Sequence, residues 1–284
     1  MNKTVRYILY AVIVAICIIA LFVGVYGVIF KDASKTNITT GNEDNETANQ
    51  VQTAEEVKNG FKDLFTNEFF KSNFDDSKVQ KADPDKEIVY DAVTSTDKKA
   101  NYYELNVHIP FININSDLAN QYNEYTQSQF VQYANNLVSK ETPGDYTIYN
   151  VSFTSYINND VLSVAILAEI KVGNEQQRTM VKTYNYNLTT NKEVTISEIL
   201  DNRGIDSTVV NKKINSTVQE AKEQEEAMID SGYNEIYQRD LQSDIYDVKR
   251  VTDFFQGPNG ELYIIYAYGN TSDIATSEMD VVVI

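Results

Sequence analysis

Three close pairs of carboxylates are the residues of this 284-residue chain that could do hydrolytic chemistry. The pairs are Asp75 with Asp76, Asp83 with Asp85, and Glu225 with Glu226. Two carboxyl groups that flank a glycosidic bond, one as acid and one as base or nucleophile, can cleave it. However, the chain holds 41 acidic residues, so close pairs arise by chance, and no pair has the apolar flanks that acid catalysis requires. We therefore expect no enzymatic activity, with a glycan- or peptidoglycan-acting enzyme that uses paired carboxylates as the alternative.

The other reactive residue types are scarce. His108 is the single histidine, and it alternates with apolar residues in a predicted strand, which is typical of half-buried packing. It has no second histidine with which to build a triad or a zinc site, and no glycine-rich phosphate loop follows a strand. The segments 83–85 and 201–206 carry aspartates but lack the spacing of a calcium loop. We expect no metal and no cofactor.

Tyrosine is unusually frequent, with 20 residues beside 12 phenylalanines and no tryptophan. A tyrosine ring packs on apolar groups while its hydroxyl hydrogen-bonds, so tyrosine is common at binding surfaces. We expect four tyrosines on predicted strands to bind the ligand: Tyr184, Tyr186, Tyr266 and Tyr268. The alternative is that these tyrosines fill half-buried sheet positions that other aromatic residues would otherwise occupy.

An uncharged apolar run extends from Tyr7 to Phe30 and follows Lys3 and Arg6. At about 1.5 Å per helical residue this run crosses a hydrocarbon core of roughly 30 Å, so we expect it to lie in the lipid bilayer. The alternative is a cleaved signal peptide, which has a shorter apolar stretch and small residues at its cleavage site. The two basic residues favour a cytoplasmic N-terminus, since positive charge stays inside. The rest of the chain is then extracellular.

Charge and cysteine content agree with an outer location. Cys17 lies inside the apolar run, so the outer part has no thiol for a disulfide or a metal site. The net charge is −17, and without Lys3 and Arg6 it is −19, because 22 basic residues face 41 acidic ones. Such a field repels nucleic acid and would attract a basic protein, although it also serves solubility alone. The asparagine-, isoleucine- and lysine-rich composition suggests a bacterium with one membrane.

Three parts of the chain follow from these patterns. Residues 1–30 are a cytoplasmic stub and a transmembrane signal anchor, and only about six residues precede the apolar run. Residues 31–52 are polar and form a flexible tether. Residues 53–284 form an extracellular α+β domain, in which a mainly antiparallel sheet packs against two or three helices.

Helical periodicity predicts three helices in this domain. The first starts at Thr53, which has capping-box spacing to Glu56, and we expect it to dock on its own domain. The alternative is a juxtamembrane helix that lies on lipid, against which the nearby acidic residues argue. Its apolar stripe consists of Val57, Phe61, Leu64, Phe65 and Phe69. The second starts at Asn115 or Ser116. Its apolar face consists of Leu118, Tyr122, Tyr125, Phe130, Tyr133 and Leu137. The third covers 206–229 and presents 222–226 to water.

Alternation of apolar and polar residues predicts the strands. Residues 102–109 form a strand that Pro110 ends or bulges. Residues 149–154, 161–172 and 180–188 form an antiparallel meander with one buried face, joined by turns at 158–160 and 173–175. Residues 262–268, which are apolar on both faces, form a central strand, and 279–284 form another buried strand.

Two stretches of the sequence resemble a known family. Residues 184–200, YNYNLTTNKEVTISEIL, are similar to a strand–turn–strand–helix signature, and 262–284 are similar to the closing strands of the same domain. This domain is the extracellular module of the anti-sigma factor RsiV, which senses lysozyme, and of the peptidoglycan deacetylase PdaC. Asn191 replaces the turn glycine of the signature, and asparagine tolerates the left-handed conformation.

The resemblance covers roughly residues 85–284. It implies the fold of this domain, but not the activities of the other domains that accompany it in RsiV and PdaC. Because only about six residues precede the apolar run, we expect no sigma-binding domain before it, and we expect no deacetylase domain. No family binding residue can be carried over. We expect a membrane-anchored extracellular domain on a bacterial cell surface that binds a basic protein or a cell-wall glycan, or that senses the state of the envelope.

Overall fold

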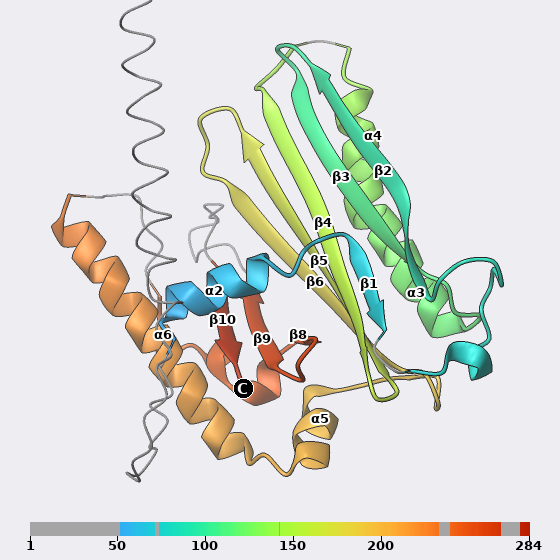
Figure 1. Cartoon of the computed structure of the whole chain (residues 1–284). Helices are drawn as coiled ribbons and strands as arrows, with labels where there is room; N and C mark the ends of the chain where they lie inside the picture. Colours follow the sequence, from blue (N-terminus) through green and yellow to red (C-terminus); the bar gives the residue numbers. More distant parts are fainter. Residues whose placement is uncertain (1–51, 72–73, 142, 233–238, 268–278) are drawn as a thin grey trace, which may run out of the picture. The chain divides into compact units, whose positions relative to one another are not determined.

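The computed structural model describes residues 52–71, 74–141, 143–232, 239–267 and 279–284 (Figure 1). The expected span from Tyr7 to Phe30, the tether up to residue 51, and Tyr268 lie outside this set. Among the helices of the described ranges, none combines the length and the apolar character needed to cross a bilayer. The membrane anchor therefore stays a prediction.

A mixed sheet forms the larger part of the domain (Figure 1). Its strands are β1 (Glu68–Lys71), β2 (Val89–Lys99), β3 (Tyr103–Ile112), β4 (Thr147–Asn158), β5 (Val161–Val172), β6 (Arg178–Asn187) and β7 (Lys192–Glu193). They follow the order β2-β3-β4-β5-β6-β7, and β1 adds to β4. Both β1 and β3 run parallel to β4, whereas the other pairs are antiparallel. The α+β class and the 161–172 strand are confirmed.

A second sheet contains β8 (Asp253–Gln256), β9 (Leu262–Ala267) and β10 (Met279–Val283). It is antiparallel, and β9 lies in its centre, as the two apolar faces of this strand predict. One face packs on Val57 and Phe61, and the other packs on Val210 and Ile214. The small sheet is therefore held between two helices.

The helices are α2 (Ala54–Lys62), α3 (Asp117–Thr126), α4 (Gln132–Val138), α5 (Ile196–Arg203) and α6 (Ser207–Asp230), and a π-helical turn (Gln127–Val131) joins α3 to α4. Helices α3 and α4 cover one face of the large sheet (Figure 1). Thr53 and Glu56 close the predicted capping box of α2, and Ser116 caps α3. Asp206 caps α6, so all three predicted helix starts are confirmed.

Several details differ from the expectations. The first helix ends at Lys62, and Phe69 lies in β1, where pairing with β4 overrides the helical pattern. Of the two outcomes expected at Pro110, the end of the strand is wrong and the bulge is confirmed, because β3 continues to Ile112 and β2 bulges opposite Pro110. Tyr125 is 45% exposed instead of facing the core.

The meander is also more buried than its alternation predicts. Residues on both faces of β5 are buried, because helices cover one face and the second sheet approaches the other. Leu162 and Ile166 point into the core under α3 and α4, while Ala165 packs with Phe255 of β8. A strand covered on two sides is apolar almost throughout, and β5 fits this rule.

Candidate functional site

An open cleft of about 470 Å³ lies beside the β6–β7 hairpin and α5. Val161 and Val194, both buried, form its floor. Its carboxylates are those of Asp160, Glu193, Glu198 and Asp201, and Lys192, Thr190, Asn187 and Asn202 complete the lining. Four carboxylates face one ammonium group, so the cleft carries a formal excess of negative charge.

The turn between β4 and β5 holds one wall of the cleft. Asp160 Oδ2 accepts a hydrogen bond of 2.9 Å from Asn187 Nδ2, and the Asp160 carbonyl accepts one of 2.7 Å from Leu188 N. Asn187 Oδ1 in turn accepts from the backbone N–H groups of Thr189 and Thr190. The two turns therefore brace one another, and the hairpin is fixed beside the Asp160 carboxylate.

Asn191 completes this hairpin in the left-handed conformation that the sequence predicts, with φ +56°. The Tyr186 hydroxyl donates to Asn191 Oδ1 at 2.8 Å and lies 3.0 Å from the Ser116 hydroxyl. Tyr186 is fully buried, so it supports the hairpin from below and does not enter the cleft.

Helix α5 supplies the opposite wall. Thr195 and Glu198 form a capping box at its start, in which Glu198 Oε2 accepts from Thr195 N at 2.7 Å. Gly204, with φ +64°, ends the helix in the left-handed conformation that glycine favours. Arg203 donates to the Gly260 carbonyl and to Gln256 Oε1, both at 2.7 Å, and thereby fastens α5 to the second sheet.

The binding chemistry of the cleft depends on carboxylate oxygens that have no hydrogen-bond partner within the described part of the protein. Within the described ranges, Glu193 and Asp201 have exposed side chains that form no ion pair and no side-chain hydrogen bond. Carboxylates of this kind accept hydrogen bonds from ammonium, guanidinium and sugar hydroxyl groups. In the part of the chain that the structure describes, no three acidic, histidine or cysteine side chains converge on a position for a metal ion.

The predicted tyrosines occupy two different cores. Tyr184 and Tyr186 are neighbours on one face of β6, and Tyr184 stacks on Tyr122 with ring centroids 4.4 Å apart. Burial raises the pKa of the Tyr184 phenol, which shares a hydrogen bond of 2.9 Å with Thr126. Tyr266 packs on Tyr246 in the second core. All three are less than 10% exposed, which favours the alternative that they are packing residues.

The three predicted carboxylate pairs do not line the cleft. Asp75 caps a short 3₁₀ helix (Asp76–Lys78), and the hydrogen bonds of Lys71 and Lys81 hold the pKa of Asp76 below its usual value. Asp83 accepts the N–H of Asp85 in a turn. His108 lies 2.6 Å from Asp91 between β3 and β2, and both side chains are half-buried.

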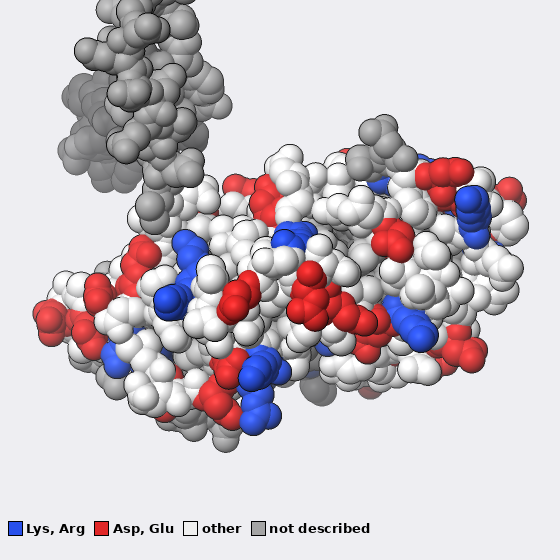
Figure 2. All heavy atoms as spheres, turned by 90° about the horizontal axis from the view of Figure 1, so that it is seen from below, with Lys and Arg blue, Asp and Glu red and all other residues white. Residues whose placement is uncertain are grey.

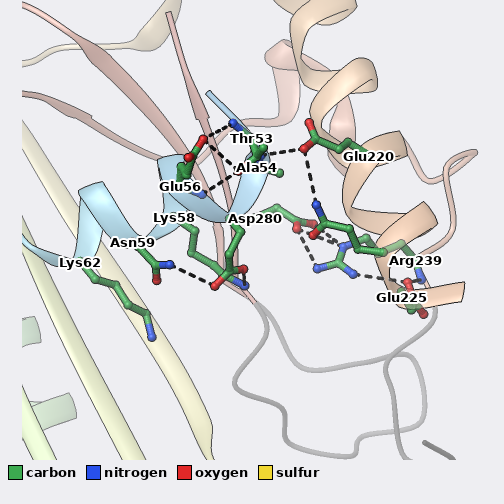
Figure 3. Close-up of polar contacts among 12 residues, drawn as sticks. Thr53, Ala54, Glu56, Lys58, Asn59, Lys62, Glu220, Glu225, Arg239 and Asp280 are labelled. Atoms are coloured by element: carbon green, nitrogen blue, oxygen red, sulfur yellow. Dashed lines mark hydrogen bonds and ion pairs between the residues drawn. The ribbon is translucent and has the colours of Figure 1, made fainter. Parts of the chain in front are cut away.

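The third pair is split between interior and surface. Glu226 is exposed, whereas Glu225, which the helical pattern places in water, is buried against Arg239 (Figure 3). Arg239 Nε lies 3.0 Å from both oxygens of Asp280, and Arg239 Nη1 lies 3.3 Å from Glu225 Oε2. We name Glu225, Arg239 and Asp280 the buried ion cluster.

The buried ion cluster joins α6 to β10 and lies beside the start of α2 (Figure 3). The Ala54 N–H donates to Glu220 of α6 at 3.1 Å. Sequence periodicity could not find this cluster, because its three members are distant in the chain and carry no spacing signal.

Charged side chains of both signs lie interspersed on the face shown in Figure 2. Acidic groups there alternate with single lysine and arginine side chains, and no broad basic surface is visible.

Comparison with known proteins gives only distant similarities. No protein-family model matches the sequence, and no curated protein matches it. A solved structure of a DUF3298 family member from Bacteroides fragilis is 14% identical with a TM-score of 0.33, covering 64% of this chain and 80% of that one. A DUF3298 family protein from Pseudomonas aeruginosa is 6% identical with a TM-score of 0.36, covering 68% of this chain and 86% of that one.

Proposed function

We propose that this protein is a membrane-anchored, non-enzymatic binding domain on the outer surface of a bacterial cell, and that the acidic cleft is its ligand site. The observation that carries the proposal is the cleft itself, in which four carboxylates face one lysine. A basic protein such as a lysozyme, or an amino- or hydroxyl-bearing cell-wall glycan, supplies the donors that these carboxylates accept.

The place of the family-like segment supports this proposal. Residues 184–200, which resemble the signature of the RsiV and PdaC extracellular module, build the β6–β7 hairpin and α5. Both walls of the cleft therefore contain this segment, and an envelope-sensing role is the role that the resemblance implies. The span from Tyr7 to Phe30 would hold the cleft outside the cell.

Binding of a lysozyme and of purified wall fragments tests the proposal. We expect saturable binding of one of them, and replacement of two cleft carboxylates (Glu193→Gln with Asp201→Asn) should weaken it about tenfold, which equals about 1.4 kcal/mol. The matched control is Glu226→Gln with Asp230→Asn, which removes the same charge from exposed positions of α6. Equal weakening in both variants would show that only the net charge matters.

The location is tested on intact cells. Protease added outside should degrade the 53–284 part, and the protein should remain in the membrane fraction after high-salt washing. Full protection of the chain in intact cells would contradict an outer domain.

The second candidate is a glycan-acting enzyme, because the four carboxylates share one cavity. Such an enzyme needs two carboxyl groups about 5 Å or about 6.5–9.5 Å apart across the bond. We expect no release of reducing ends from wall fragments. Release that disappears with Glu193→Gln would establish the enzyme instead.

A further inference from the structure

An apolar pocket of about 150 Å³ lies where the segment after α2, the strands β1 and β4, and the end of β8 with its following turn meet. Leu64 and Phe70 line it on one side, Tyr156 closes it from β4, and Phe255 and Pro258 line it from the second sheet. Phe70 is 39% exposed, so an aromatic ring at the mouth of the pocket is open to solvent. We name this cavity the Phe70 pocket.

The volume and the apolar lining of the Phe70 pocket determine which kind of chemical group can bind in it. An enclosed apolar cavity of about 150 Å³ holds a molecule as large as benzene, and the Phe70 pocket has a similar volume but is open to solvent on one side. The lining of the Phe70 pocket is almost entirely apolar, so a sugar would lose the hydration of its hydroxyls there without gaining hydrogen bonds. One aromatic or branched aliphatic side chain fits both requirements.

The Phe70 pocket and the cleft are close enough for one partner. Tyr156 lines the pocket and Asp160 lines the cleft, and four residues span at most about 14 Å even when fully extended. An interface that buries about 800 Å² on each partner extends over a larger distance than this. The separation of the two sites is therefore within the extent of one such interface.

A rigid turn fixes the two sites relative to each other. Pro258 enters the Phe70 pocket, while the Gly260 carbonyl accepts from Arg203 at the end of α5, next to Asp201 of the cleft. The turn is closed by hydrogen bonds from Gly257 N to the Glu261 carbonyl and from Gly260 N to the Gly257 carbonyl. The spacing between an apolar pocket and an acidic cleft is therefore built into the fold.

We propose that the Phe70 pocket takes one apolar side chain of the same basic protein whose lysine or arginine groups enter the acidic cleft. Asp63 at the rim of the pocket adds a further carboxylate for a basic neighbour of that side chain. The inference rests on the proposed function and narrows it, because it selects a protein over a wall glycan. A side chain that is buried in a pocket and ringed by contacts that exclude water is the usual form of an interface anchor.

Two measurements on the complete chain test the inference. In the first, toluene is titrated into the protein, and the amide NMR signals of Thr154 and Tyr156 are followed. We expect saturable shifts, which Phe70→Ala should weaken. A lack of saturation would overturn the inference whether or not any protein binds to the cleft.

In the second measurement, the affinity of the Phe70→Ala variant for a lysozyme is compared with that of the wild type. We expect about a tenfold loss, as is usual for an interface anchor. Tyr125→Ala is the matched control, because Tyr125 is an aromatic residue of similar exposure on α3 and should change nothing. Unchanged affinity in Phe70→Ala together with a loss in the cleft variant would overturn the pocket's role and leave the proposed function standing.

Discussion

Two groups of carboxylates in this domain differ in what faces them. In the buried ion cluster, Glu225 and Asp280 lie on either side of Arg239, and the three side chains are 3–4% exposed. In the acidic cleft, four carboxylates share one lysine and most of them remain open to water. The same side-chain chemistry therefore connects elements in one place and leaves free hydrogen-bond acceptors in the other.

The difference follows from the cost of removing charge from water. A buried carboxylate must be paired and hydrogen-bonded, because the desolvation penalty is several kcal/mol per ion. A carboxylate at the surface has no such need and can keep its acceptors for a ligand. Exposure and engagement together, and not the number of acids, separate a structural group from a candidate site.

The largest effect is expected from breaking the buried ion cluster. Arg239→Met should lower the free energy of unfolding by about 3–5 kcal/mol, because two buried carboxylates lose their partner. Urea denaturation measures this loss. The control is Arg250→Ala, whose pair with Asp244 is exposed and should contribute less than about 1 kcal/mol. A loss of similar size in both variants would contradict the comparison.

How far the sequence could predict these regions depends on how local their signals are. The capping box of Thr53 and Glu56 lies within four residues, and the alternation over 161–172 defines a whole strand, so both were predictable. The parallel pairing of Phe69 with Ser155 depends on residues far apart, and no local pattern reports it. Glu225 looks like a surface residue because Arg239 and Asp280, which neutralise it, come from other segments.

The cleft was not predicted as a site, and only parts of its frame carry local signals. The left-handed Asn191 follows from residue type, and Thr195 with Glu198 has the spacing of a capping box. The cleft itself required Asp160 to approach the 187–202 segment, which only the pairing of β5 with β6 brings about. The tyrosines are conspicuous in the sequence because they are frequent. The burial of Tyr184 and Tyr186 depends on the position of α3, and that of Tyr266 depends on the second core.

The second prediction concerns salt, which should weaken binding at the acidic cleft but leave the contribution of the buried ion cluster to stability almost unchanged. Binding of a lysozyme at the cleft should weaken strongly between 0.1 M and 1 M NaCl, because the Debye length falls from about 10 Å to about 3 Å. The variant with Glu193→Gln and Asp201→Asn should show a smaller salt dependence. The loss of stability in Arg239→Met should change little, since buried pairs are screened less. Affinity that does not depend on salt would contradict an electrostatic site.

The third prediction distinguishes the effect of a helix cap on stability from its effect on binding at the cleft. Thr195→Ala removes a capping hydroxyl from α5 and should cost about 1 kcal/mol of stability. It also removes one of the two hydrogen bonds that hold the Glu198 carboxylate in the cleft, and the bond from the Thr195 backbone N–H remains. Thr53→Ala removes the equivalent hydroxyl from α2 and should cost a similar amount. Only the Thr195 variant should change binding, measured by calorimetry. Equal binding in both variants would show that the position of Glu198 is irrelevant.

The smallest effect concerns an exposed carboxylate that is engaged. Asp206 caps α6, and a backbone hydrogen bond of 2.6 Å from Thr208 N lowers its pKa below the usual value. A lowered pKa in the folded state adds stability above the unfolded pKa of about 3.9, and this stability is lost as the pH falls through the lower folded value. Asp206→Asn keeps the cap, because asparagine caps about as well as aspartate, but its side chain cannot ionise.

The wild type should therefore be more stable than Asp206→Asn at pH 6, and the difference in stability should vanish in acid. A difference between the two proteins that stays constant from pH 6 to pH 2.5 would show that the Asp206 carboxylate, although hydrogen-bonded, contributes no more through its charge than an amide does.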